Sequence, residues 1–278
     1  MIDNDNDNDN DNETTKIIPK IIFIIPYRDR KEEFSLFINK MEELLFLVDK
    51  TTYQYIFVHQ CDNREFCRGG LKNIGFLVVK EKYPDSYLDI TLVFNDIDTY
   101  PSEINLIKDY STTHGTIKHF YGYVFALGGI VSITCKDFEK INGFPNYWGW
   151  GFEDNMLNQR VLNANLFIDR NEFYRIDDRR ITQLNGSPLR TVNRIEFDRF
   201  VQRNKEGIHS INHLLYTIEY VRSDNNSDNI IFANVSDFNT GYECIQRFNA
   251  IYDTRSKTPP FQVGYSGNRR ATMNLVQY

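Results

Sequence analysis

The chain has 278 residues, of which 41% are hydrophobic and 14% aromatic, enough for the core of one large domain or two small ones. The net charge of −6 comes from residues 1–13, which contain five Asp, one Glu and no Lys or Arg, so residues 14–278 are formally neutral. A neutral remainder does not indicate binding to nucleic acid or to an acidic membrane surface.

An Asp-Asn repeat fills most of residues 1–15 and predicts a disordered tail, because it offers no apolar side chain after Ile2 that could be buried. The repeat has neither the basic start nor the apolar run of a signal peptide. The longest apolar run, Ile21–Pro26, is far shorter than the roughly 20 residues that span a bilayer. We therefore expect no membrane span and a cytoplasmic location.

The cysteines lack the regular spacing of a metal site, and we expect free thiols in a reducing compartment. A disulfide between Cys61 and Cys67 is the alternative. The four cysteines are Cys61, Cys67, Cys135 and Cys244.

Strands and helices are predicted to alternate over the first hundred residues. Three apolar, β-branched runs are typical of strands buried on both faces, and they are Lys20–Pro26, Tyr53–His59 and Ile90–Phe94. Asp29 and Glu32 have the spacing of a capping box before a helical apolar stripe from Phe34 to Val48, and a second helix is expected over 71–79. This alternation predicts an α/β fold with a mostly parallel central sheet flanked by helices.

The pattern continues less regularly towards the C-terminus. Gly122–Thr134 is interpreted as two strands broken at Gly128 and Gly129, followed by a short helix and a turn, and Glu153–Ala164 as a further helix. After about residue 235 the pattern weakens. We expect one domain over 16–250 and a loosely packed tail over 251–278.

Polar residues follow each of the first three predicted strands, at the carboxyl edge of the sheet where open α/β folds bind ligands. Asp96 and Asp98 suit a divalent cation such as Mg²⁺ or Mn²⁺, and an Asp-rich turn is the simpler interpretation. Arg28, Arg30 and Arg68 suit an anionic ligand, although each alone could form a surface salt bridge.

The segment Trp148–Asn155, with the sequence WGWGFEDN, contains both tryptophans of the chain. Glu153 and Asp154 begin a predicted helix, where they could cap its positive end or take a proton from a sugar hydroxyl while an indole stacks on the sugar. Gly149 and Gly151 would allow the segment to move as a lid.

The run Ile141–Asn155 resembles the signature of the β-1,4-galactosyltransferases, which are inverting enzymes of the GT-A fold. Further segments resemble that family in the same order over roughly residues 20–220. They are 24–30, Phe66–Phe76, Phe94–Pro101, Gly128–Thr134 and Phe197–Phe200.

The resemblance implies a transfer from a UDP-sugar to a hydroxyl of a glycan or glycoconjugate. Asp154 would be the catalytic base, with Glu153 beside it, and Asp98 with Asp96 would bind Mn²⁺ or Mg²⁺. The implied donor-binding residues are Pro26, Arg28, Arg30, Phe66, Arg68, Asp96, Ala126, Gly129 and Trp150. The implied acceptor-binding residues are Tyr123, Trp150, Glu153, Asp154 and Phe197.

The chain also departs from the family. The stretch Ile176–Pro188 contains no His or Met where the family completes its metal site. Ala126 replaces an aromatic residue, which predicts space for a hexose or an N-acetylhexosamine. Asn155 and Glu196 differ on the acceptor side, so the acceptor is expected to differ. A polypeptide N-acetylgalactosaminyltransferase-like enzyme and a catalytically silent glycan- or nucleotide-binding module are the alternatives.

Overall fold

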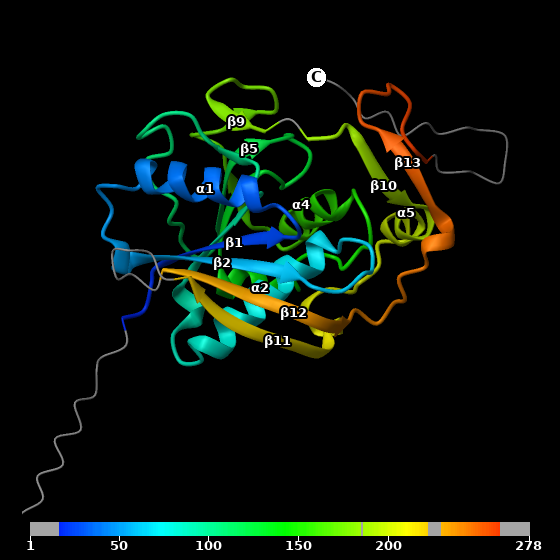
Figure 1. Ribbon diagram of the computed structural model, residues 1–278, viewed down its shortest axis with the longest axis horizontal. Helices are drawn as coiled ribbons and strands as arrows, with labels where there is room; N and C mark the ends of the chain where they lie inside the picture. The colour runs from blue at the N-terminus through cyan, green and yellow to red at the C-terminus, as the bar shows by residue number, and fades with distance from the viewer. Residues whose placement is uncertain (1–16, 185, 222–228, 262–278) are drawn as a thin grey trace, which may run out of the picture.

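A mixed β-sheet runs through the computed structural model, which describes residues 17–184, 186–221 and 229–261 (Figure 1). The tail predicted at residues 1–15 lies outside these ranges. Along the sheet the strand order is β11-β12-β2-β1-β3-β6-β5-β7, with β8 paired to β5. The strands of this sheet are β1 (Ile21–Tyr27), β2 (Tyr53–Gln60), β3 (Thr91–Asn95), β5 (Thr116–Gly122), β6 (Ile130–Thr134), β7 (Phe167–Asp169), β8 (Tyr174–Arg175), β11 (Asn212–Val221) and β12 (Ile230–Asn239).

The first three predicted strands are confirmed, and β1 pairs in parallel with both β2 and β3. Pro26 lies inside β1 instead of ending it. A proline is tolerated there because the ladder with β3 extends only over Ile21–Ile24, which leaves Pro26 with a neighbouring strand on one side.

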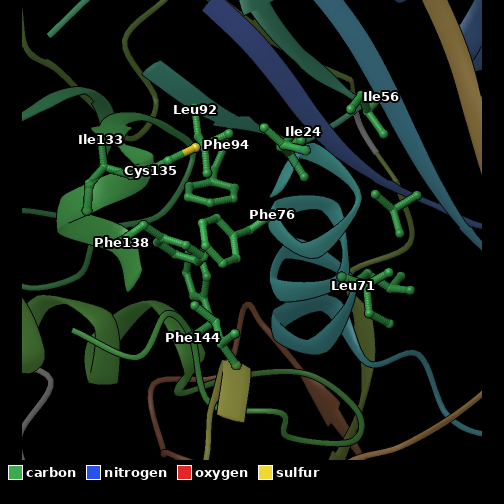
Figure 2. Packing of buried hydrophobic residues seen from close by; sticks show 14 of the residues in the cluster. Ile24, Ile56, Leu71, Phe76, Leu92, Phe94, Ile133, Cys135, Phe138 and Phe144 are labelled. Atoms are coloured by element: carbon green, nitrogen blue, oxygen red, sulfur yellow. The ribbon is translucent and has the colours of Figure 1, made fainter. Parts of the chain in front are cut away.

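Helices cover both faces of the sheet. Alternate residues of β1 and β2 point to opposite sides: Ile24 and Val58 pack with α2 (Arg68–Lys82), whereas Ile25 and Phe57 pack with α1 (Lys31–Leu44). Figure 1 shows α1 and α2 on opposite sides of these strands, and Figure 2 shows α2 side chains against the sheet and the aromatic cluster of Phe94, Phe138 and Phe144. The remaining helices are α3 (Cys135–Lys140), α4 (Glu153–Asn163) and α5 (Arg194–Val201).

The capping box predicted at Asp29 and Glu32 is wrong. Asp29 has φ 51°, Arg30 is the residue before the helix, and no side chain caps the first turn. Arg30 instead donates to Glu33 at 2.7 Å, so the loop after β1 is held by an ion pair.

Two strands that the sequence did not predict extend the sheet beyond β2. Residues of β12 pair in parallel with β2, from Ile230 opposite Tyr55 to Val235 opposite Gln60, and β11 pairs antiparallel with β12. The predicted domain boundary at residue 250 lies inside β13 (Asn249–Asp253), which pairs with β10 (Leu189–Asn193). The folded part therefore continues past that boundary.

Short elements complete the described chain. β4 (Thr99–Pro101) pairs with β9 (Ile181–Gln183), and the 3₁₀ helices are Lys50–Thr52, Tyr87–Asp89, Ile208–Ser210 and Gln246–Phe248. All four cysteines are free thiols, as expected. Within the described ranges, no helix has both the length and the apolar character needed to cross a bilayer.

Candidate active site

Arg68, the first residue of α2, joins three carboxylates from two segments, Asp96 after β3 and the adjacent Glu153 and Asp154 at the start of α4. Its Nε and Nη2 donate to the two carboxylate oxygens of Asp96, each at 2.8 Å. Its Nη1 donates to Glu153 Oε1 at 2.8 Å and to Asp154 at 2.8 and 2.9 Å. We call these four residues the Arg68 cluster. Arg68 and Asp96 lie at the carboxyl edge of the sheet, as the sequence predicted, and the start of α4 brings Glu153 and Asp154 to the same place.

The carboxylates of the Arg68 cluster differ in their electrostatics. Burial opposes ionisation of Asp96, but the charges of Arg68 and Lys72 outweigh it and hold the pKa of Asp96 below its usual range. Burial, followed by the neighbouring charge of Asp154, raises the pKa of Glu153. Asp154 keeps a quarter of its side chain exposed, whereas Glu153 keeps 7%. Of these two adjacent acids, Asp154 is therefore the more accessible to a substrate.

Asp98 lies two residues beyond Asp96, and burial and the charge of Asp96 raise its pKa. Its hydrogen-bond partner is the Thr99 hydroxyl at 3.0 Å. A half-buried carboxylate beside a second one suits a divalent cation, which would offset both charges. The residues present therefore fit Mn²⁺ or Mg²⁺, although the described residues contain no group of three or more His, Cys, Asp and Glu side chains.

The segment that lacks the expected His and Met runs beside Asp98. β9 pairs with β4, opposing Gln183 to Thr99, and the Leu184 N–H donates to the Asp98 carbonyl at 2.8 Å. The Gln183 amide oxygen accepts from the Tyr121 hydroxyl at 3.2 Å. Since amide oxygens also ligate hard cations, Gln183 is the additional candidate ligand that this geometry offers.

The first of the two strands predicted over Gly122–Thr134 is wrong, because β5 ends at Gly122 and residues 123–129 form a loop before β6. At Gly128 this loop brings backbone against Asp154. The Leu127 N–H donates to the Asp154 carbonyl at 2.9 Å, and a Cβ atom at Gly128 would lie 2.3 Å from Asp154 Oδ2. Gly129 has φ 71°, and a Cβ there would lie 2.3 Å from the Tyr121 carbonyl. Both positions require glycine for this close approach.

The two tryptophans have different environments. Trp148 is 1% exposed and stacks on Phe238, whereas Trp150 is 44% exposed and stacks on Tyr252 with ring centroids 6.1 Å apart. The backbone N–H of Trp150 donates to the Thr191 carbonyl at 2.8 Å. Of the two, Trp150 has the exposed ring, and its role in ligand binding stays a prediction.

The remaining donor residues surround the Arg68 cluster less directly. The Arg28 guanidinium lies 5.4 Å from the ring centroid of Phe66 and donates to the Arg64 carbonyl at 2.8 Å. Arg30 is paired with Glu33, as described above, and Ala126 is buried. The structure therefore brings Arg68, but not Arg28 or Arg30, into hydrogen-bonding contact with Asp96, Glu153 and Asp154.

Two of the predicted acceptor residues, Tyr123 and Phe197, differ in their exposure to solvent. Tyr123 is half exposed, and its ring stacks on Phe125 at 5.2 Å. Phe197 is instead buried against Phe152 and Phe200, so its ring has little surface for a sugar. Its acceptor role stays a prediction.

Glu196 does not face the candidate site. It is buried and ion-paired with Arg199, which also pairs with Glu206. We call Glu196, Arg199 and Glu206 the Arg199 cluster. Glu196, at which the chain departs from the family, therefore belongs to a buried ionic cluster. This cluster packs against the segment before Trp148, since the Arg199 guanidinium lies over the Tyr147 ring.

Sequence reasoning did not identify Lys72, a buried cation 3.6 Å from Asp154 Oδ1. A lysine among the apolar residues of a helix is ordinarily interpreted as a solvated side chain. The signal that could have identified Lys72 is its position four residues after Arg68, which places both side chains on the same face of the helix.

Comparison with known proteins identifies the class. Residues 10–108 match the model of the N-terminal region of glycosyl transferase group 7, and residues 110–184 match a model described as the N-terminal domain of galactosyltransferase. The fold is similar to the catalytic domain of Drosophila β1,4-galactosyltransferase 7 in complex with xylobiose. That comparison has a TM-score of 0.60 and 21% identity, and covers 79% of this chain and 94% of that one. The architecture is thus the GT-A fold of the glycosyltransferases.

The chain belongs to glycosyltransferase family 7, the β-1,4-galactosyltransferase family. It is 32% identical over 160 residues to the xylosylprotein 4-β-galactosyltransferase of Caenorhabditis elegans, covering 54% of this chain and 53% of that protein. It is 31% identical over 163 residues to β-1,4-galactosyltransferase 7 of Drosophila melanogaster, covering 55% and 48%. The chain spans about half the length of these relatives.

Proposed function

We propose that the protein is an inverting glycosyltransferase that moves a hexose or N-acetylhexosamine from a UDP-sugar to a hydroxyl of an acceptor glycan. The observation that carries the proposal is the Arg68 cluster, in which one guanidinium holds Asp154 and Asp96 at the same edge of the sheet. This contact fixes Asp154, the base for the acceptor, relative to Asp96 and Asp98, the carboxylates that would hold the metal of a metal diphosphate.

In this mechanism Asp154 takes the proton of the acceptor hydroxyl, whose oxygen attacks the anomeric carbon while the bond to UDP breaks. Arg68 orients the Asp154 carboxylate through its hydrogen bonds, and Glu153 is held on the same guanidinium. Mn²⁺ or Mg²⁺ held by Asp98, Asp96 and Gln183 would supply positive charge to the departing diphosphate. A solved structure of a variant of the Drosophila enzyme, which is in complex with manganese, UDP-Gal and xylobiose, supports this assignment.

The proposed substrate classes follow from the residues on the donor side and on the acceptor side of the site. The small side chain of Ala126 supports a donor pocket that accepts an N-acetyl group as well as a hydroxyl. The exposed rings of Trp150 and Tyr123 support a sugar acceptor, because aromatic faces stack on the apolar faces of sugar rings. A polypeptide acceptor and a binding module without turnover are the competing outcomes.

Transfer across a panel of UDP-sugars, with and without Mn²⁺, tests the proposal. We expect metal-dependent transfer by the parent protein and a fall in kcat of at least about 10²-fold in Asp154→Asn. The matched control is Asp198→Asn, which changes an exposed carboxylate paired with Arg194 on α5. Calorimetry of UDP with Mn²⁺ checks that Asp154→Asn still binds the nucleotide.

Unchanged turnover in Asp154→Asn would remove Asp154 from the role of base. Binding of UDP without turnover for any donor or acceptor would favour the silent module. Loss of Mn²⁺ binding in Asp98→Asn, measured by electron paramagnetic resonance, tests the metal site without using activity.

A further inference from the structure

Lys72 is a buried charge that the mechanism above does not use. It lies on α2, four residues after Arg68, with 1% of its side chain exposed. Its Nζ is 3.6 Å from Asp154 Oδ1. The ammonium also lies 4.6 Å from the ring centroid of Phe144 and 5.8 Å from that of Phe94.

This environment opposes a lysine unless its charge is compensated. Burial lowers the pKa of Lys72, and Arg68 adds repulsion, whereas Asp154, Asp96 and Glu153 favour the charged form. A buried ammonium loses the hydration that stabilises its charge in water. The aromatic faces and the Asp154 carboxylate are the groups that offset this loss.

The charge balance of the Arg68 cluster shows what Lys72 adds. Arg68 is shared among three carboxylates, so it cannot neutralise them alone. Lys72 is the second cation beside Asp154 in the described part of the chain. Lys72 approaches Asp154 from the buried face of α2, whereas Asp154 keeps part of its side chain exposed.

We propose that Lys72 is a positioning residue for the reaction, which holds the Asp154 carboxylate in place and aimed at the acceptor. The inference rests on the proposed function. Because Lys72 is enclosed by protein, it stays beside Asp154 when a substrate enters, whereas the partly exposed Arg68 can exchange a carboxylate for a phosphate oxygen. The simpler alternative is that Lys72 only balances charge in the folded core.

The kinetics of Lys72→Met in the full chain separate these two roles. We expect kcat to fall 10- to 100-fold while the KM for the UDP-sugar changes less than twofold and the thermal midpoint is retained. Lys72→Arg, which keeps a cation, should recover part of kcat. The matched control is Lys80→Met, two turns along the same helix at a half-exposed lysine that pairs with Glu139, and its kcat should be unchanged.

A double-variant comparison checks that Lys72 acts through Asp154. In an Asp154→Asn background, Lys72→Met should cause no further loss of the residual turnover. A parent-like kcat in Lys72→Met, or an equal loss of turnover in both backgrounds, would overturn the proposal.

The test distinguishes this inference from the proposed function. If the parent protein turns over no UDP-sugar, the proposed function fails, and the contact is then tested by urea unfolding of Lys72→Met, Asp154→Asn and the double variant. Coupled residues give midpoint shifts that do not add. Additive shifts of the unfolding midpoint would overturn the role of Lys72 at Asp154. The proposal would also be overturned if Lys72→Met did not fold and Lys72→Arg folded without measurable turnover.

Discussion

Two ionic clusters in this protein combine an arginine with carboxylates, and they differ in their access to solvent. In the Arg199 cluster the side chains of Arg199, Glu196 and Glu206 are 6%, 5% and 1% exposed. In the Arg68 cluster, Asp96 keeps 30% of its side chain exposed. The same pairing chemistry therefore forms a sealed structural contact in one place and an accessible set of acids in the other.

The position of each cluster explains this difference. The Arg68 cluster lies at the carboxyl edge of the sheet, where β3 ends and α2 and α4 begin, and polar groups there are left partly uncovered. The Arg199 cluster lies under the ring of Tyr242, 3.9 Å from the guanidinium, and beside that of Tyr147. We infer that the Arg199 cluster supports the segment before Trp148, while the Arg68 cluster performs chemistry.

The largest expected effect is the loss of stability on removing Arg199. Arg199→Met leaves Glu196 and Glu206 buried without their cation, which should cost about 3–5 kcal/mol in the free energy of unfolding. Arg68→Met should cost less, because Asp96 and Asp154 can reach water. Urea unfolding of both variants measures the difference, and an equal loss would remove the distinction between the sealed and the open cluster.

Stability should also depend on pH through the sealed cluster. Burial, only partly offset by Arg199, raises the pKa of Glu196 to about 7 from an ordinary 4.5. The folded state then binds a proton that the unfolded state releases, so this residue's contribution is present below about pH 4.5 and is lost as the pH rises to about 7. The full loss is roughly 3 kcal/mol.

Unfolding midpoints of the parent and Glu196→Gln, measured between pH 5 and 8, test this dependence. The glutamine does not titrate, so the fall in stability between pH 5 and 7 should be smaller in the variant. Parallel curves for the two proteins would contradict the prediction. The partly exposed Asp198→Asn is the control, since its curve should follow that of the parent.

A methyl group at Gly128 should disturb the open cluster without affecting the sealed one. The added Cβ of Gly128→Ala would lie 2.3 Å from Asp154 Oδ2, so the carboxylate must move. A displacement of about 1 Å at a reacting group can cost about 10²-fold in rate. We expect kcat to fall by about that factor with an unchanged affinity for UDP and Mn²⁺, and a parent-like kcat would show that Asp154 is not held there for catalysis.

The sequence predicted the parts of this arrangement that depend on local patterns. The buried strands, the start of α4 at Glu153 and the edge positions of Arg68 and Asp96 follow from apolar runs and the polar residues after them. β12 was missed because Asn and Asp interrupt its apolar alternation, and the strand is stabilised by its neighbour β2.

Long-range contacts set the limit of the prediction. Lys72 looks like a solvated lysine until the fold brings Asp154 to it, from 82 positions further along the chain. Glu196 was interpreted on the acceptor side, because its pairing with Arg199 and Glu206 exists only in three dimensions. Such pairings have no local pattern in a single sequence.

The smallest expected effect concerns the two tryptophans, which repeat the contrast between sealed and open sites. Tyr252→Ala removes the ring that stacks on the exposed Trp150, an interaction of about 0.5–1.5 kcal/mol, and leaves the buried Trp148 untouched. Freed from this contact, Trp150 should become more accessible to acrylamide, and the KM for the acceptor should rise a few-fold with little change in kcat. Fluorescence quenching in a Trp148→Phe background isolates Trp150, and Tyr220→Ala, at an exposed tyrosine on β11, is the control. If quenching and KM do not change in Tyr252→Ala, β13 does not hold the Trp150 ring, and residue 150 is held through its backbone N–H, which donates to the Thr191 carbonyl.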